Sequence, residues 1–288
     1  AFFSWARYRQ EKGRTPLLAL EVLDSKTERS AIFALLVMGA LGPAVNFLIP
    51  LYIQIVQGRT TMQTSIAVVP YTLAIFASAV LIVRLYKRLT PRQIGSIGFI
   101  IVAIGLAILA FTIGNDWGTP MVILGLVILG LGEGSLLTLL FNVMVSSSPK
   151  ELAGDVGALR GTANNLSTAL GTAFSSVVAV SLLSMLVMSS LAGNPTLPPA
   201  LQAEVALDNI TPPRNDHLQE TLSTTTATPE QVTAAVAINE EARLRALKAA
   251  FIILAAIALL AIFPARGLPS YTPGEVDAGV ELEPQKTT

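Results

Sequence analysis

Residues 121–145 read MVILGLVILGLGEGSLLTLLFNVMV, and the only ionisable side chain in this run belongs to Glu133, at its middle. The run is longer than the roughly 20 apolar residues that a helix needs to cross a bilayer. An ionisable group near the bilayer midplane is costly, and it is by default a candidate for function. The run therefore predicts a transmembrane helix with one side chain that requires a functional explanation.

The composition of the whole chain favours the membrane. Of its 288 residues, 52% are hydrophobic and 13% are charged, and the mean hydropathy is +0.62. Soluble domains carry about 25% charged residues. The net charge of zero gives no reason to propose a nucleic-acid partner. Without cysteine, and with His217 as the single histidine, no metal site is expected. The sequence predicts an all-α membrane protein.

Five further apolar runs predict five more transmembrane helices, over residues 31–56, 63–85, 94–113, 156–190 and 248–263. Five of the six helices thus fall within residues 31–190. Pro43 and Pro50 lie in the first helix and favour a kink there, unless neighbours satisfy the freed carbonyls. The last helix is short for a hydrocarbon layer of roughly 30 Å, so we expect either that Lys248 snorkels to the membrane surface or that neighbouring helices support the span.

The remaining segments are expected to lie in water. Residues 1–30 are predicted to form a cytoplasmic loop, with residues 1–5 as the end of a preceding helix. The chain opens without methionine, so we expect a longer protein. Residues 191–247 are predicted to form an extracytoplasmic loop with a helix from about 229, because Thr228, Pro229 and Gln231 have the signature of a helix start. Residues 264–288 are predicted to be a cytoplasmic tail.

The distribution of basic residues predicts the orientation. Six spans place both ends of the chain on one side, and that side receives every Lys and Arg except Arg59, Arg214, Arg243, Arg245 and Lys248. Short loops rich in Lys and Arg stay in the cytoplasm. We therefore expect a multi-pass protein of the cell membrane with both termini of this chain in the cytoplasm.

Small residues recur along one face of the fifth predicted helix, at alternating spacings of four and three, namely Gly157, Gly161, Asn164, Thr168, Gly171 and Ser175. Small residues in this register let membrane helices approach closely. Gly130 and Gly134 repeat the pattern in the fourth helix. We predict a helix-packing role for Gly130, Gly134, Gly157, Gly161 and Gly171. The run 130–134 is not interpreted as a phosphate loop, because apolar runs flank it on both sides.

Polar side chains inside the predicted helices are the candidates for a site. Asn46, Tyr52, Gln54, Asn142, Asn164 and Asn165 are candidates for lining a cavity, with helix-to-helix hydrogen bonds as the alternative. Glu133 is interpreted as a proton-coupling or substrate-binding residue, and a neutral structural acid is the alternative. Arg84, Asp155 and Arg160 are candidates for a cytoplasmic gate. Arg84 has the alternative role of an anchor at the membrane surface, and for the other two the alternative is an ordinary solvated helix entrance.

Several segments, in this order and spacing, carry a resemblance to a known family: Pro16-Leu17-Leu18, Ile49 to Gln54 with Gly58, Val69-Pro70, Gly130 to Gly132, Pro149, Gly154, and Ala158 to Gly171. Together they resemble the carboxy-terminal half of a major facilitator superfamily transporter, in the fourteen-helix drug:proton antiporter branch. Asn164-Asn165 departs from an Arg-Gln pair common in that family.

This resemblance implies one six-helix half-bundle of a major facilitator fold, which pairs with a missing amino-terminal half around a central cavity. It implies multidrug efflux by alternating access, with proton influx driving export of an amphipathic or cationic small molecule. The implied partners are the lipid bilayer, the missing half and the substrate, and the proton gradient replaces any cofactor.

Two other interpretations stay open. A carrier for uptake or for metabolite export would have the same fold. A six-span scaffold or sensor would use residues 191–247 to bind a partner. An enzyme is not expected, because the predicted helices hold no paired carboxylates, no His-Glu-x-x-His motif and no Ser-His arrangement.

Overall fold

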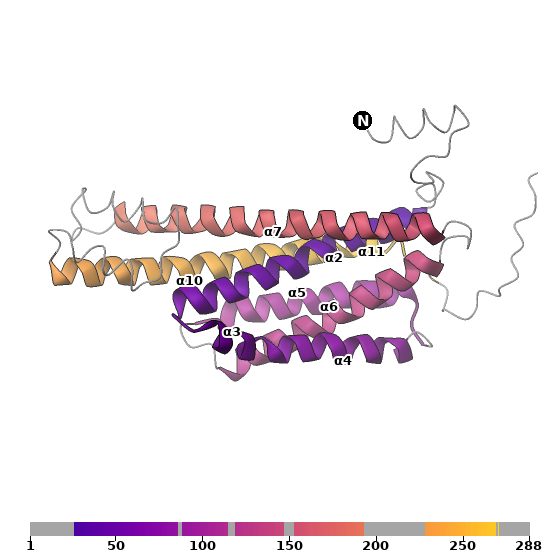
Figure 1. Ribbon diagram of the computed structural model, residues 1–288, viewed down its shortest axis with the longest axis horizontal. Coiled ribbons are helices and arrows are strands. Elements are labelled where there is room, and N and C mark those ends of the chain that lie inside the picture. The colour runs from indigo at the N-terminus through magenta and orange to yellow at the C-terminus, as the bar shows by residue number, and fades with distance from the viewer. Residues whose placement is uncertain are drawn as a thin grey trace, which may run out of the picture.

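A computed structural model describes residues 26–85, 88–114, 119–146, 153–192, 228–268 and 270. These residues form helices and no strand: α2 (Lys26–Leu51), η2 (Tyr52–Val56), α3 (Thr61–Ala67), α4 (Val69–Leu85), α5 (Pro91–Thr112), α6 (Pro120–Ser146), α7 (Ala153–Ala192), α10 (Pro229–Leu260) and α11 (Ile262–Ala265) (Figure 1). Most of the loop predicted over residues 1–30, most of the 191–247 loop and most of the tail lie outside the described residues, and residues 26–30 of the first loop belong to α2.

Six stretches of the described chain are long and apolar enough to cross a membrane, namely Arg29–Gln54, Thr61–Leu85, Pro91–Thr112, Pro120–Leu140, Gly161–Ser190 and Pro229–Ala265. The described part of the protein is therefore an all-α membrane bundle with six candidate spans. This confirms the predicted fold class.

Three of the helices begin with the same local structure, a capping box. In each box a threonine oxygen accepts from the backbone N–H three residues on, and a glutamine side chain accepts from the threonine N–H in return. The pairs are Thr60 with Gln63, Thr90 with Gln93 and Thr228 with Gln231. Proline follows the threonine in α5 and α10, where its missing N–H costs no hydrogen bond.

The end of α2 changes its helical form after a proline. The helix continues through Pro43 and Pro50, and residues Tyr52–Val56 then adopt a π-helix, η2. Proline removes a backbone donor, and a π-turn is one way for a helix to accommodate the local disruption. Tyr52 donates its hydroxyl to the carbonyl oxygen of Gly114, and Gln57 Nε2 donates to the same oxygen at 3.5 Å. These bonds tie the end of α2 to the segment after α5.

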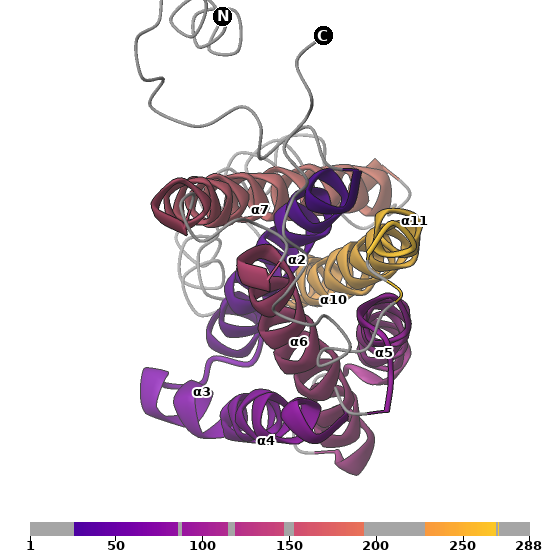
Figure 2. The same ribbon diagram turned by 90° about the vertical axis from the view of Figure 1, so that its right-hand side faces the viewer.

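Helix α6 is the central helix of the bundle. It packs against α5, α4 and α2, while α7 lies along α2 and α10, and α10 also packs against α5. Figure 2 shows α6 between α2, α4 and α5 in the end-on view. Leu126, Leu136, Leu139 and Leu140 of α6 are fully buried. The side chain at the middle of this helix is therefore held in the interior of the described bundle.

Three of the predicted packing glycines lie against the backbone of a neighbouring helix. A Cβ atom at Gly130 would lie 2.5 Å from the carbonyl oxygen of Tyr71, and one at Gly134 would lie 2.3 Å from that of Ile75. Both contacts join α6 to α4. A Cβ at Gly171 would lie 2.2 Å from the carbonyl oxygen of Ala40, where α7 crosses α2. Real Cβ atoms do not approach so closely, so only glycine fits at these crossings.

The other two packing candidates have no such neighbour. A Cβ atom at Gly157 or Gly161 would meet no heavy atom of the described residues within 4 Å. The crossing of α7 with α2 involves Ser167 and Gly171, which lie further along α7. A packing role for Gly157 and Gly161 stays a prediction.

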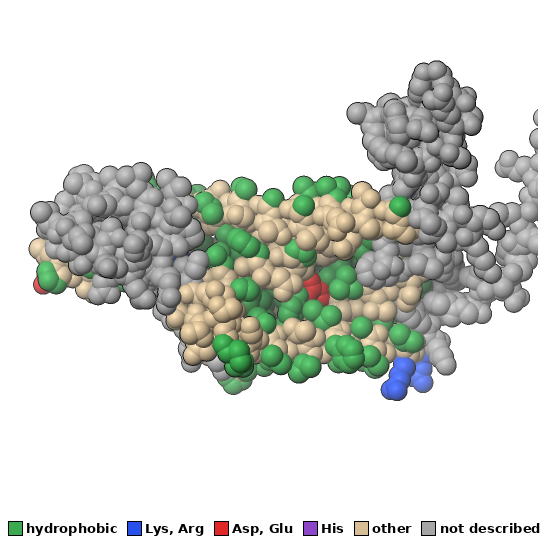
Figure 3. Space-filling view, in the orientation of Figure 1, with side chains coloured by type: hydrophobic (Ala, Val, Ile, Leu, Met, Phe, Trp, Pro, Cys, Tyr) green, Lys and Arg blue, Asp and Glu red, His purple; other side chains and the backbone are tan. Residues whose placement is uncertain are grey.

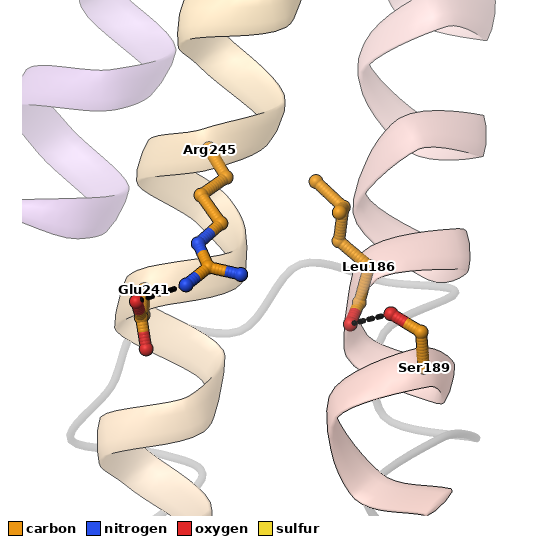
Figure 4. Close-up of polar contacts among 4 residues, drawn as sticks. All are labelled: Leu186, Ser189, Glu241 and Arg245. Carbon is orange, nitrogen blue, oxygen red and sulfur yellow. Dashed lines mark hydrogen bonds and ion pairs between the residues drawn. The ribbon is translucent and has the colours of Figure 1, made fainter. Parts of the chain in front are cut away.

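The adjoining ends of α7 and α10 extend beyond the other helices (Figure 1). They share their own apolar cluster, formed by Leu183, Val187, Val232, Ala235, Ala242 and Ala246. Figure 4 shows that Arg245 bonds to Glu241 at 2.5 Å on α10, and that Ser189 donates to the carbonyl of Leu186 on α7. Both charged side chains are exposed. Exposed charges are costly in hydrocarbon, so this ion pair favours an aqueous surrounding for its turn of α10.

The extension explains why the last predicted span looks short in the sequence. Helix α10 runs without a break from Pro229 to Leu260, and its later turns place Ala250, Phe251 and Leu254 in the main core. The apolar run 249–263 is therefore the part of a longer helix that lies among the other spans.

Candidate functional site

Glu133 lies at the middle of α6 and is 3% exposed. Its carboxyl group lies between two neighbouring helices. The Tyr71 hydroxyl of α4 donates a hydrogen bond to Oε2. On the other side, a Cβ atom at Gly42 of α2 would lie 2.4 Å from Oε1. The carboxyl group is thus held between a hydrogen-bond donor on α4 and the backbone of α2.

Asn46 extends this contact toward the surface. Its side chain lies near the hydroxyl of Tyr71 and lines the same cavity. Tyr71 is 3% exposed, whereas Asn46 is exposed. The series Asn46, Tyr71, Glu133 therefore joins α2, α4 and α6, and it connects a buried carboxyl group to an accessible amide.

A cavity of about 170 Å³ contains these three residues. Residues of α2, α4, α6 and α7 line it: Met38, Gly39, Gly42, Pro43, Asn46, Tyr71, Ile75, Glu133, Leu137, Asn164 and Thr168. Glu133 is the only one of these lining residues with a carboxyl group or a basic group. In the face drawn in Figure 3, acidic atoms lie midway along the bundle among hydrophobic side chains. The cavity thus holds one carboxyl group among neutral side chains.

The structure brings some of the sequence candidates together and leaves others apart. Asn46 and Asn164 line the cavity with Glu133. Tyr52 is buried elsewhere, with its hydroxyl bonded to Gly114, and Gln54 lies in η2. Asn142 and Asn165 are exposed outside this cavity. For these four residues, a role in lining a larger cavity stays a prediction.

The structure does not test the candidates for a cytoplasmic gate. Arg84 is exposed in the last turn of α4. Asp155 and Arg160 lie in α7, but their side chains lie outside what the structure describes. Their role in a gate stays a prediction.

The sequence interpretation missed Tyr71 and Gly42. Tyr71 is the one tyrosine in the run 63–85. A buried tyrosine hydroxyl usually has a hydrogen-bond partner, and this was the available signal. Sequence alone does not pair Tyr71 with Glu133, because 62 residues separate them. No signal identified Gly42, since its importance comes only from the carboxyl oxygen beside it.

Fold and site together define a multi-pass membrane protein with one buried carboxyl group in a small cavity. The family model of the Major Facilitator Superfamily matches residues 2–172, which are more than half of the chain. The chain belongs to the Major Facilitator Superfamily, a family of membrane transporters rather than enzymes.

Three curated relatives are similar to this chain. The multidrug efflux pump LfrA of Mycolicibacterium smegmatis is 28% identical over 168 residues, which are 57% of this chain and 32% of LfrA. The tetracenomycin C resistance and export protein of Streptomyces glaucescens is 26% identical over 62% of this chain and 33% of its own length. The tetracycline resistance determinant of Streptomyces rimosus is 30% identical over 50% of this chain and 45% of its own length. The chain thus spans less than half of each of these relatives.

Proposed function

We propose that this chain is part of a proton-coupled exporter of amphipathic or cationic small molecules, and that it forms the carboxy-terminal half of a transporter of the fourteen-helix branch. One observation carries the proposal. Glu133 places a single carboxyl group, almost fully buried, in a cavity whose other described polar groups are neutral. An ionisable group inside a membrane is expected to couple the binding of a proton to the binding of a cationic substrate.

The chemistry requires only one carboxyl group. In its ionised form Glu133 attracts the positively charged group of a substrate. A proton that binds to the same carboxyl group cancels the charge, and the attraction is lost. Proton and substrate therefore compete for one site, and each lowers the affinity of the other by the same factor. An inward proton gradient then favours release of the substrate outside, provided that the cavity opens to one side at a time.

Exposed apolar faces on three helices support a partner half. On α3 and α4 these side chains recur at spacings of four and three, as Met62, Ile66, Val69, Leu73, Phe76, Val80 and Val83. On α7, Leu170, Phe174 and Val177 are exposed. We propose that these faces are covered by a missing amino-terminal half and by the surrounding lipid. The greater length of the three relatives agrees with this proposal.

The proposed orientation places both termini of this chain in the cytoplasm of the cell. Arg84, Arg88 and Arg92 are exposed around the junction of α4 and α5. Figure 3 shows Lys and Arg atoms at the end of the bundle opposite the extension of α7 and α10. Because basic residues in short loops stay in the cytoplasm, that end is the proposed cytoplasmic side of the cell membrane, and the extension is extracytoplasmic.

The names of the relatives support the substrate class. One is described as a multidrug efflux pump, one as a resistance and export protein, and one as a resistance determinant. Small molecules of drug type are therefore the proposed substrates here, with export as the proposed direction.

Export of the cationic dye ethidium tests this proposal. Cells that produce the natural transporter are loaded with dye and energised, and the dye inside is followed by fluorescence. We expect faster loss of dye than in cells without the gene, and we expect a protonophore to remove the difference because it collapses the proton gradient. A scaffold or sensor gives no difference at all. Export that continues unchanged after the protonophore contradicts proton coupling.

A further inference from the structure

We infer that Tyr71 is the positioning residue of this site, holding the carboxyl group of Glu133 with one oxygen toward the cavity and stabilising its ionised form relative to its neutral form. This inference rests on the proposed function, because it assigns the residue that prepares Glu133 to bind a proton or a cation. The hydrogen bond from Tyr71 to Oε2 is the first observation. A hydrogen bond to a charged acceptor is roughly twice as strong as one between neutral groups.

Among the described groups that face Glu133, Tyr71 is the one that donates a hydrogen bond to its carboxyl group. From α2, Gly42 and Asn46 face the carboxyl group or its cavity, and from α7, Asn164 and Thr168 do so. All four are neutral. On the side of α5, Gly132, which precedes Glu133 in the sequence, packs against Val102. Among the described lining residues, therefore, no lysine, arginine or histidine compensates a charge on Glu133. An ionised carboxylate buried in apolar surroundings requires a donor, and Tyr71 supplies it.

The glycines of α6 fix where this donor lies. Gly130 contacts the backbone of Tyr71 itself, and Gly134 contacts that of Ile75, one turn further along α4. The two glycines flank Glu133 in the sequence. They bring α4 to the shortest possible distance from α6 on both sides of the carboxyl group. The close packing thus sets the separation between the Tyr71 hydroxyl and Glu133, which gives the glycines a role beyond stability.

The hydroxyl keeps its own proton in this arrangement. A proton that arrives from the cavity binds to Glu133, and the tyrosine O–H continues to donate to the carboxyl group. Loss of the hydroxyl therefore changes the balance between the ionised and neutral carboxyl group, without removing the group that titrates. This gives an effect on pH dependence that a merely structural tyrosine does not have.

The test is Tyr71→Phe in the natural transporter, purified and reconstituted in lipid vesicles. The initial rate of ethidium transport is measured across a series of pH values with a constant pH difference across the membrane. We expect the profile to move to higher pH by about one to two units, the size that loss of a hydrogen bond to a charged group gives. We also expect the maximal rate to recover at the higher pH.

Ser78→Ala is the matched control. Ser78 Oγ also donates from α4 to α6, at 2.5 Å, but its acceptor is the neutral carbonyl of Leu131. If bonds between α4 and α6 serve only to hold the helices together, both variants lower the rate and neither moves the profile. That outcome overturns the inference. A shift with Tyr71→Phe and none with Ser78→Ala supports it.

A second variant covers the case in which Tyr71→Phe does not accumulate in the membrane. Replacement of Tyr71 by 3-fluorotyrosine preserves the shape and makes the hydroxyl a stronger donor, so the profile is expected to move to lower pH. An unchanged profile contradicts the inference. Glu133→Gln distinguishes failure of the proposed function from failure of the positioning role. If this variant still exports dye, the proposed function is wrong. If it is inactive while both Tyr71 variants keep the normal pH profile, only the positioning role of Tyr71 is wrong.

Discussion

Glu133→Gln is expected to strongly reduce the export of ethidium driven by a proton gradient, while the amount of folded protein in the membrane stays near normal. Glutamine has the shape of glutamate, and its amide oxygen still accepts from Tyr71, so the contact between α4 and α6 survives. Its side chain neither carries charge nor binds a proton at neutral pH. The link between proton and dye is therefore lost, and the dye gradient falls by about fivefold or more, the lower range of coupling between two ligands.

Everted membrane vesicles measure this effect directly. Dye uptake is followed after a proton gradient is generated, and the quantity of transporter is determined by immunoblot. Glu241→Gln is the matched control, because Glu241 is an exposed acid on the extension of α10, paired with Arg245. We expect normal transport from this control. Full transport by Glu133→Gln contradicts the role assigned to Glu133.

Gly171→Ala is expected to have the largest effect on stability. The added Cβ atom would lie 2.2 Å from the carbonyl oxygen of Ala40 and 2.6 Å from its Cα atom, so the backbones of α2 and α7 must move apart. Overpacking of this kind costs about 1–3 kcal/mol. We expect a lower thermal unfolding temperature for the purified transporter in detergent, followed by near-ultraviolet circular dichroism or by the reactivity of a thiol dye with an introduced buried cysteine.

Gly161→Ala provides the control on the same helix. No described heavy atom lies within 4 Å of a Cβ at this position. Alanine is favoured over glycine in a helix by up to about 1 kcal/mol, so the variant is expected to unfold at the same temperature or slightly higher. Equal destabilisation by Gly161→Ala and Gly171→Ala contradicts the assignment of the close contact to α2. It shows instead that the whole stripe of small residues packs against another part of the transporter.

The sequence predicts the features that depend on one segment at a time. Glu133 is recognisable because a single acid interrupts a long apolar run. The start of α10 is recognisable because Thr228 and Gln231 bond to one another within one turn, with Pro229 at the first helical position. These patterns are local, so their physical causes are present in the sequence itself.

Features that depend on two segments are not predicted in this way. The register of the small residues on α7 defines a face, but not the helix that covers it. A Cβ atom at Gly171 would clash with the backbone of α2, whereas one at Gly161 would have no described heavy atom within 4 Å. Likewise, the sequence makes Tyr52 a candidate for lining a cavity, but in the structure its hydroxyl donates a hydrogen bond to the carbonyl oxygen of Gly114. The pairing of Tyr71 with Glu133 belongs to the same class, because it arises only when α4 packs on α6.

Proton release on substrate binding tests the central claim most directly. Ethidium is added to the purified natural transporter in weakly buffered detergent solution, at a pH where the site is protonated, and a pH indicator records protons set free. Competition for Glu133 predicts that the natural protein releases protons in proportion to the dye bound, and that Glu133→Gln releases none. Equal release from the two proteins would contradict the claim that proton and substrate share this carboxyl group.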